Sequence, residues 1–133
     1  MTGKTNLSEL ITNMSPVVHP EEYVFVSLKN PDIISRDDRI CEFREKEGTS
    51  LIIKKQKADE LNITYQYICS WITLEVNSSL QAVGFTAAFS SELAKHNLSC
   101  NVIAGYHHDH IFVETKNAQK AMTILTELSS IKK

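Results

Sequence analysis

The stretch GFTAAFSSELAKHNLSCNVIAGYHHDHIFV, residues 84–113, contains the pattern that decides the fold. Its first half places Phe89 and Leu93 four residues apart, which predicts a helix that buries both side chains. Its second half predicts two strands, near residues 100–106 and 111–113, joined by a tight connection. A helix followed by a pair of antiparallel strands is therefore expected in this part of the chain.

The alternation of helices and strands continues on both sides of this stretch. Upstream and downstream, the periodicity predicts helices at 7–14, 55–62 and 118–128 and strands at 23–28, 40–44, 50–54 and 66–76. This alternation indicates an α+β fold, an antiparallel sheet with helices on one face. Each half resembles a ferredoxin-like βαββαβ unit that lacks one element. The order of elements therefore predicts two interleaved units, although the halves share no sequence repeat.

Composition and charge exclude several classes of function. The chain has 133 residues, 42% of them hydrophobic and 23% charged, with a net charge of −2. Nucleic-acid binders need a cationic surface to displace counterions, and no such stripe is visible. The apolar stretches have the length of strands, far below the ~20 residues of a membrane span. With no signal peptide and three scattered cysteines, we expect a cytoplasmic protein with free thiols.

The loop before the predicted helix that contains Phe89 and Leu93 is a candidate anion site, and plain helix packing is the alternative role of this segment. Ser78 and Gln81 fit a capping box that would start the helix at Ser79. Gly84 argues for a later start, because a glycine inside a helix costs about 1 kcal/mol relative to alanine. In that alternative, the loop runs to Val83 and the helix opens near Gly84. Either start presents unpaired backbone N–H groups that suit a carboxylate.

These residues resemble the ACT domain family. The resemblance covers residues 71–128. It rests on the pattern SS-x-x-x-VG-h-TAA, where h is an apolar residue. A helix, two strands with an aspartate at their turn, and a second helix follow this pattern. It is closest to the subtype found in small stand-alone tandem proteins and in aspartokinase-like regulatory regions. Upstream, FREKEGTSLIIKKQKADEL, residues 43–61, resembles the partner unit of the same stand-alone proteins.

The resemblance implies a non-catalytic regulatory module of two ferredoxin-like ACT units, at 1–65 and 66–133, sharing strands as one compact body. It implies no cofactor, a small-molecule ligand that is an amino acid, and assembly into a homo-oligomer. It places the ligand at the seam between units. The implied ligand-binding positions are Ser78, Ser79, Val83, Gly84, Phe85, Thr86, Asn101, Val102, Ile103 and Asp109.

The chemistry of an amino acid assigns roles to these positions. The amides of Gly84, Phe85 and Thr86 suit the ligand's carboxylate, assisted by the helix dipole. Its ammonium group suits Asp109 or the backbone carbonyls of residues 101–103. A turn-forming role for Asp109 is the alternative.

Three other functions compete with this interpretation. His107, His108 and His110 could contribute to a metal sensor, but alternating strand residues point to opposite faces, and two imidazoles leave a tetrahedral ion short of ligands. Cys100 could act as a nucleophile beside a histidine, but an apolar strand makes a thiol inert. The last alternative is a docking or dimerisation module that binds no ligand.

Overall fold

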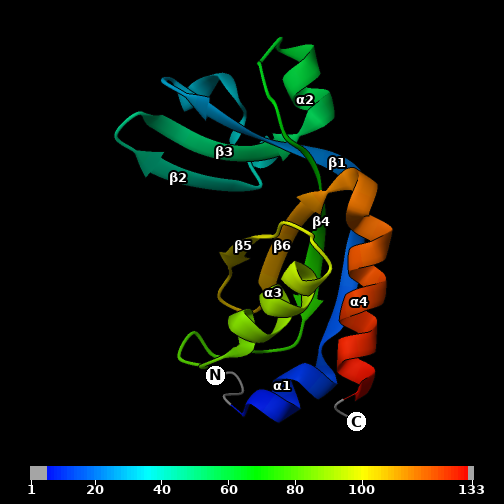
Figure 1. Ribbon diagram of the computed structural model, residues 1–133. Coiled ribbons are helices and arrows are strands. Elements are labelled where there is room, and N and C mark those ends of the chain that lie inside the picture. Colours follow the sequence, from blue (N-terminus) through cyan, green and yellow to red (C-terminus); the bar gives the residue numbers. More distant parts are fainter. Residues whose placement is uncertain (1–5, 132–133) are drawn as a thin grey trace. The chain divides into compact units, whose positions relative to one another are not determined.

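The computed structural model of the protein describes residues 6–131 and shows the expected mixed α+β fold (Figure 1). The strands are hydrogen-bonded in the order β2-β3-β1-β4-β6-β5. The elements, in which η marks a short 3-10 helix, are α1 (Leu7–Asn13), β1 (Ser15–Leu28), η1 (Pro31–Ile33), η2 (Arg36–Asp38), β2 (Cys41–Glu45), β3 (Gly48–Lys54), α2 (Lys55–Glu60), β4 (Ile68–Glu75), α3 (Phe85–Lys95), β5 (Asn101–Ala104), β6 (Asp109–Glu114), η3 (Thr115–Asn117) and α4 (Ala118–Ile131).

The chain forms two compact units that are not consecutive in sequence. Unit 1 combines the described parts of Met1–His19 and Ser70–Lys133, and unit 2 is Pro20–Cys69. The strands β1 and β4 each contribute residues to both units. One extended strand can therefore contribute backbone hydrogen bonds to both units.

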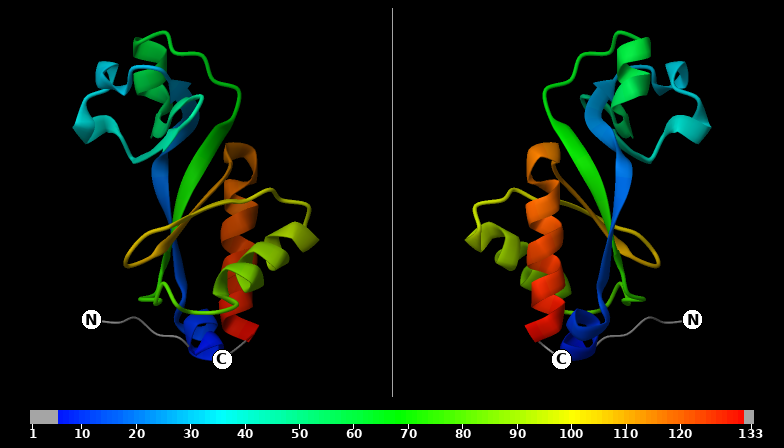
Figure 2. Two further views of the ribbon diagram at one scale, coloured as in Figure 1. Left: turned by 90° about the vertical axis from the view of Figure 1, so that its left-hand side faces the viewer. Right: turned by 90° about the vertical axis from the view of Figure 1, so that its right-hand side faces the viewer.

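Unit 1 is a sheet covered by helices on one face. Figure 2 shows α3 and α4 on the same side of β4 in both views, and α1 contacts both helices. The predicted strand at residues 66–76 is present as β4, and Ile72, Leu74 and the following Val76 all lie in the core beneath the helices. Phe89 and Leu93 of α3 are fully buried in the same core, as predicted.

The start of α3 decides between the two predicted helix boundaries. The helix begins at Phe85, and Gly84 precedes it with a left-handed backbone of φ +94°. The left-handed region costs a residue with a Cβ atom about 1–2 kcal/mol, so glycine is favoured at this position. The loop interpretation is therefore correct, and the capping-box start at Ser79 is wrong.

Unit 2 is a three-stranded ladder with one short helix. The hairpin of β2 and β3 turns between Glu45 and Gly48, and β3 pairs with β1 from Tyr23↔Lys54 to Leu28↔Thr49. The helix α2 follows β3 and buries Ala58 in the core of this unit. Among residues 6–131, no helix has both the length and the apolar character that a membrane span needs.

Candidate functional site

The loop from β4 to α3 leaves the first amides of α3 without a side-chain cap. Its backbone turns at Ser79, whose hydroxyl accepts a hydrogen bond from the N–H of Gln81 at 3.0 Å. No side chain among the described residues caps α3 at Gly84. Unbonded N–H groups and the positive end of the helix dipole therefore remain at Phe85 and Thr86, where they can attract an anion.

A small hollow of about 80 Å³ opens between this loop and the β5–β6 hairpin of unit 1. One wall is the start of α3, and the other is the end of β5 with the beginning of β6. Its lining residues are Ser78, Ser79, Leu80, Ala82, Phe85, Thr86, Ala104 and Asp109.

Asp109 is the charged group of this hollow. It is only 8% exposed, and burial raises the pKa of its carboxyl group above the usual value. Its side chain forms no hydrogen bond or ion pair with another residue of the described chain. Among the described residues, every side-chain nitrogen or oxygen atom that is fully enclosed has a hydrogen-bond partner. Because the oxygens of Asp109 have no partner, they are not fully enclosed and are open to the hollow. A nearly buried carboxylate without a partner favours a cationic group beside it.

The hollow therefore presents opposite charges on its two walls. The carboxylate of Asp109 lies on β6, and the amides of Phe85 and Thr86 lie at the positive end of α3. A ligand with one cationic and one anionic group matches this arrangement, because each of its charges would meet the opposite charge.

The structure gathers half of the residues that the sequence suggested. Lining the hollow are Ser78, Ser79, Phe85, Thr86 and Asp109. The remaining five, Val83, Gly84, Asn101, Val102 and Ile103, do not line it.

Two of these five lie in the loop before α3. Val83 is 84% exposed and points to solvent. Gly84 faces a neighbouring helix, because a Cβ atom at this position would lie 3.3 Å from Cδ2 of Leu7. A side chain at position 84 would therefore meet Leu7 of α1 and not the hollow.

The pairing of β5 with β6 explains the placement of the other three. Asp109 is opposite Ala104, and His110 is opposite Ile103. Side chains alternate along a strand, so Asn101 and Ile103 lie on the face opposite Asp109. Val102 shares the face of Asp109 but packs against the core. Sequence reasoning missed Ala104, although the predicted hairpin places it directly across from Asp109.

The histidines near this hairpin form separate contacts. Nδ1 of His108 is 3.4 Å from the carbonyl oxygen of Val76, and the ring of His107 packs edge-on against Tyr106. Nδ1 of His110 is 3.0 Å from the indole nitrogen of Trp71. Within residues 6–131, no group of three or more histidine, cysteine or carboxylate side chains could hold a metal ion.

Cys100 has the chemistry of a structural thiol. Burial raises its pKa to about 11, so the thiolate form is scarce at neutral pH. The thiolate is the nucleophilic form of cysteine. This environment therefore disfavours catalysis by Cys100.

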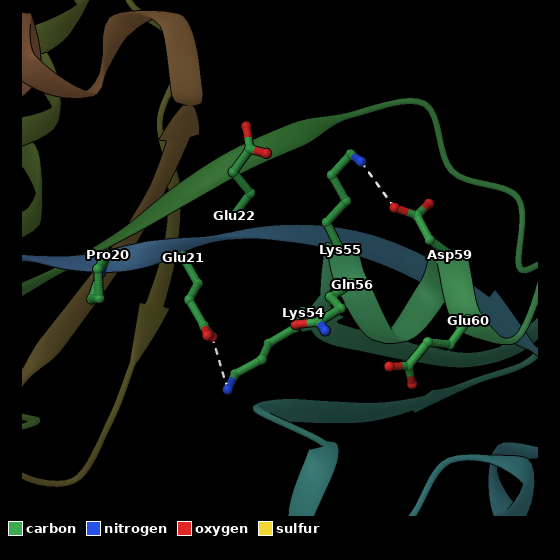
Figure 3. A pocket seen from close by; sticks show the side chains of 8 residues that line it. All are labelled: Pro20, Glu21, Glu22, Lys54, Lys55, Gln56, Asp59 and Glu60. Carbon is green, nitrogen blue, oxygen red and sulfur yellow. Dashed lines mark hydrogen bonds and ion pairs between the residues drawn. The ribbon is translucent and has the colours of Figure 1, made fainter.

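Unit 2 has a larger, open hollow of about 660 Å³ beside α2 (Figure 3). Figure 3 shows Lys54 pointing to Glu21 and Lys55 pointing to Asp59, at nitrogen–oxygen distances of 2.8 Å and 2.9 Å. Tyr65 also donates to Asp59 at 2.7 Å. Glu22 also lines this hollow, but its side chain is exposed to solvent. The described lining of this hollow therefore lacks the nearly buried, unpartnered carboxylate that distinguishes the hollow of unit 1.

Comparison of the sequence with family models identifies both halves of the chain. Models described as ACT domain match residues 2–70 and residues 66–127. The chain belongs to the ACT domain family. The resemblance seen in the sequence and its ferredoxin-like fold are thus confirmed. ACT domains are regulatory modules that bind small ligands, and they are not themselves catalytic.

Solved structures share this fold. A Vibrio cholerae protein of unknown function, described as a possible transport protein, is 42% identical with a TM-score of 0.83, over 92% of this chain and 95% of that one. The regulatory subunit of aspartate kinase from Thermus thermophilus has a TM-score of 0.59 at 9% identity. The match covers 89% of this chain and 98% of that subunit. Aspartate kinase from Clostridium acetobutylicum has a TM-score of 0.64 at 14% identity, over 94% of this ACT protein and 36% of the enzyme. No curated protein matches the sequence.

Proposed function

We propose that this ACT protein is a non-catalytic sensor that binds a free amino acid in the hollow of unit 1. The ammonium group of the ligand pairs with Asp109, and its carboxylate accepts hydrogen bonds from the amides of Phe85 and Thr86. The observation that carries this proposal is the nearly buried carboxylate of Asp109, which has no partner among the described residues. Its position across from the uncapped start of α3 favours a zwitterion over a simple cation.

The size of the hollow supports a ligand held by its head group. A volume of about 80 Å³ is far below the roughly 300–1,000 Å³ of pockets that enclose a whole drug-sized ligand. A charged head group fits this space better than a large side chain does. The ligand's side chain therefore extends outward past Leu80, which is 66% exposed.

The experiment is a thermal-shift panel of the twenty amino acids. A ligand present at about 100 times its dissociation constant stabilises the folded state by about 2.7 kcal/mol. The substitution Asp109→Asn keeps the size of the side chain and removes the charge that pairs with the ammonium group, so it should abolish the shift. Asp37→Asn, at an exposed position of unit 2, makes the same chemical change away from the hollow and should leave the shift intact. Flat melting curves across the panel, or an equal shift in both variants, would contradict the proposal.

Exposed apolar side chains favour a second function, docking to a protein without a small ligand. Val83 is 84% exposed and Leu80 is 66% exposed, both in the loop before α3. Contiguous apolar exposure often marks a protein interface. Replacing Val83 by serine would weaken docking or self-association and leave amino-acid binding at Asp109 unchanged, because Val83 does not line the hollow.

We also propose that the protein acts in the cytoplasm as a homo-oligomer. Open sheet edges such as β2 and β5 favour association between chains. Light scattering at high concentration should give a mass above the 15.0 kDa of one chain. A strictly monomeric species would count against this part of the proposal.

A further inference from the structure

Trp71, the only tryptophan of the chain, lies between two histidines from neighbouring strands of unit 1. The ring of His19 on β1 stacks on the indole, with ring centroids 3.7 Å apart and planes inclined by 12°. On β6, Nδ1 of His110 lies 3.0 Å from the indole Nε1. The three side chains therefore connect the strands β1, β4 and β6.

A buried hydroxyl group joins the two imidazole rings. Thr73 is 6% exposed, and its Oγ1 atom is 2.8 Å from Nε2 of His19 and 3.1 Å from Nδ1 of His110. A threonine hydroxyl can donate one hydrogen bond and accept others. It can therefore accept from His19 while it donates to His110.

The indole fixes the protonation state of His110. An indole N–H group only donates hydrogen bonds, so Nδ1 of His110 must be the acceptor in the 3.0 Å contact. An acceptor nitrogen carries no proton, which places the ring proton of His110 on Nε2. A proton added to Nδ1 would oppose the indole N–H donor and break this hydrogen bond.

The His110 ring also has little room to turn away. A Cβ atom at Gly105 would lie 3.2 Å from Nε2 of His110 and 2.8 Å from the carbonyl oxygen of His108. The ring thus packs against the glycine backbone on one side and meets Trp71 and Thr73 on the other. Loss of the hydrogen bond therefore has to move the indole, the hydroxyl or a strand.

The surrounding groups favour a neutral His110. Burial is the largest cause that lowers the pKa of His110, and the neighbouring His108 and His19 lower it further. Burial also lowers the pKa of His19, while Glu75 on β4 opposes this effect. His110 has no carboxylate among the groups that shift its pKa.

We propose that His110 is a proton-operated lock in the sheet of unit 1. The neutral ring accepts hydrogen bonds from Trp71 and Thr73 and so connects β4 to β6. Protonation at Nδ1 replaces the acceptor with a donor, and the cluster of His19, Trp71, Thr73 and His110 opens in mildly acidic solution. This inference does not depend on the identity of any ligand.

The single tryptophan makes this lock directly observable. In a 15N-labelled protein, the indole N–H group of Trp71 gives one resonance, which can be followed from about pH 8 to about pH 5, the range in which histidines titrate. We expect the resonance to leave its hydrogen-bonded position with a midpoint below about 6.5, the pKa of an unperturbed histidine. An indole resonance that stays fixed over this range would overturn the proposal.

Variants assign the transition to His110. In His110→Gln, the amide oxygen can accept from the indole but does not titrate, so the resonance should keep its position without a pH-dependent shift. His96→Gln changes an exposed histidine at the end of α3 and should retain the wild-type transition. A transition that persists unchanged in His110→Gln would exclude His110 as the titrating group.

A second variant keeps the test informative if His110→Gln does not fold. Removing the imidazole of His19 in His19→Gln takes away a like charge that disfavours protonation of His110. The midpoint of the indole transition should therefore rise. An unchanged or lower midpoint in His19→Gln would contradict the coupling on which the lock depends.

Discussion

The two compact units differ in the connection that follows β4 in unit 1 and β1 in unit 2. In unit 1, β4 leads through a loop into the full helix α3, and the charge of Asp109 has no partner among residues 6–131. In unit 2, β1 leads into two 3-10 turns, and the side chain of Arg39 closes them. Unit 1 thus holds a nearly buried carboxylate without a partner among the described residues, and unit 2 pairs the carboxylates of Asp32 and Glu42 with Arg39.

Arg39 holds the connection in unit 2 through hydrogen bonds and ion pairs within the chain. Its guanidinium donates to the carbonyl oxygens of Ile34 at 3.0 Å and Pro31 at 3.1 Å. It also pairs with Glu42 at 3.1 Å and Asp32 at 3.4 Å. Five N–H donors on a rigid fork allow one arginine to hold such a loop. Within one fold, a carboxylate thus stays without a partner in one connection, and an arginine pairs with the carboxylates of the other.

The largest effect is expected from Arg39→Met, which breaks the closed connection. Methionine keeps part of the apolar stem but leaves the carbonyls of Pro31 and Ile34 without their donor. The free energy of unfolding should fall by about 2–3 kcal/mol, measured by urea denaturation. Arg36→Met, at an exposed arginine of the same segment, is the control and should change stability by less than about 0.5 kcal/mol. Equal stability of both variants would mean that Arg39 does not hold the loop.

A smaller effect is expected from Gly84→Ala, which tests the backbone of the open connection. Alanine in the left-handed region costs about 1–2 kcal/mol, and its Cβ atom would press against Leu7. The control Ser91→Ala, at an exposed position inside α3, should instead stabilise the protein by about 0.5 kcal/mol because alanine is the better helix former. If Gly84→Ala stabilised the protein, position 84 would be an ordinary helical residue.

The smallest change in stability is expected from Asp109→Asn. The pKa of the Asp109 carboxyl group is raised in the folded state. Above this raised pKa, the ionised carboxylate lowers the free energy of unfolding. The loss disappears once the pH falls below the pKa that the group has in the unfolded chain. Without ligand at neutral pH, the variant should therefore be more stable than wild type by up to about 1 kcal/mol, since solvent in the hollow screens the charge. Denaturation at several pH values should show this difference shrinking as the pH decreases. A destabilised variant would indicate that Asp109 already has a partner.

The proton lock adds a pH dependence in the range where histidines titrate, and the sequence of unit 2 contains no histidine. Because the folded cluster binds protons more weakly than unfolded histidines do, the free energy of unfolding should decrease as the pH falls through about 6.5. The melting temperature of wild type should fall over this range more than that of His110→Gln. Parallel decreases in both proteins would place the acid sensitivity elsewhere.

Local patterns were sufficient for most elements of this fold. The spacing of Phe89 and Leu93 predicted a buried helix face, and the pattern of residues 66–76 predicted the strand β4. The beginning of β1 was not predicted, because Pro16 and Pro20 normally interrupt strands. Both prolines precede Tyr23, where the ladder with β3 begins, so no hydrogen bond in that ladder needs their missing N–H groups.

The candidate site shows where sequence reasoning stops. The sequence alone determined the ACT pattern, the glycine that precedes α3 and an aspartate at the start of β6, because each depends on residues that are close along the chain. Only the tertiary structure decided that Ala104 and not Ile103 shares a face with Asp109, that Gly84 faces Leu7, and that Asp109 lacks a partner. Strand register and burial decide these features, and both arise from contacts between segments that are distant in the sequence.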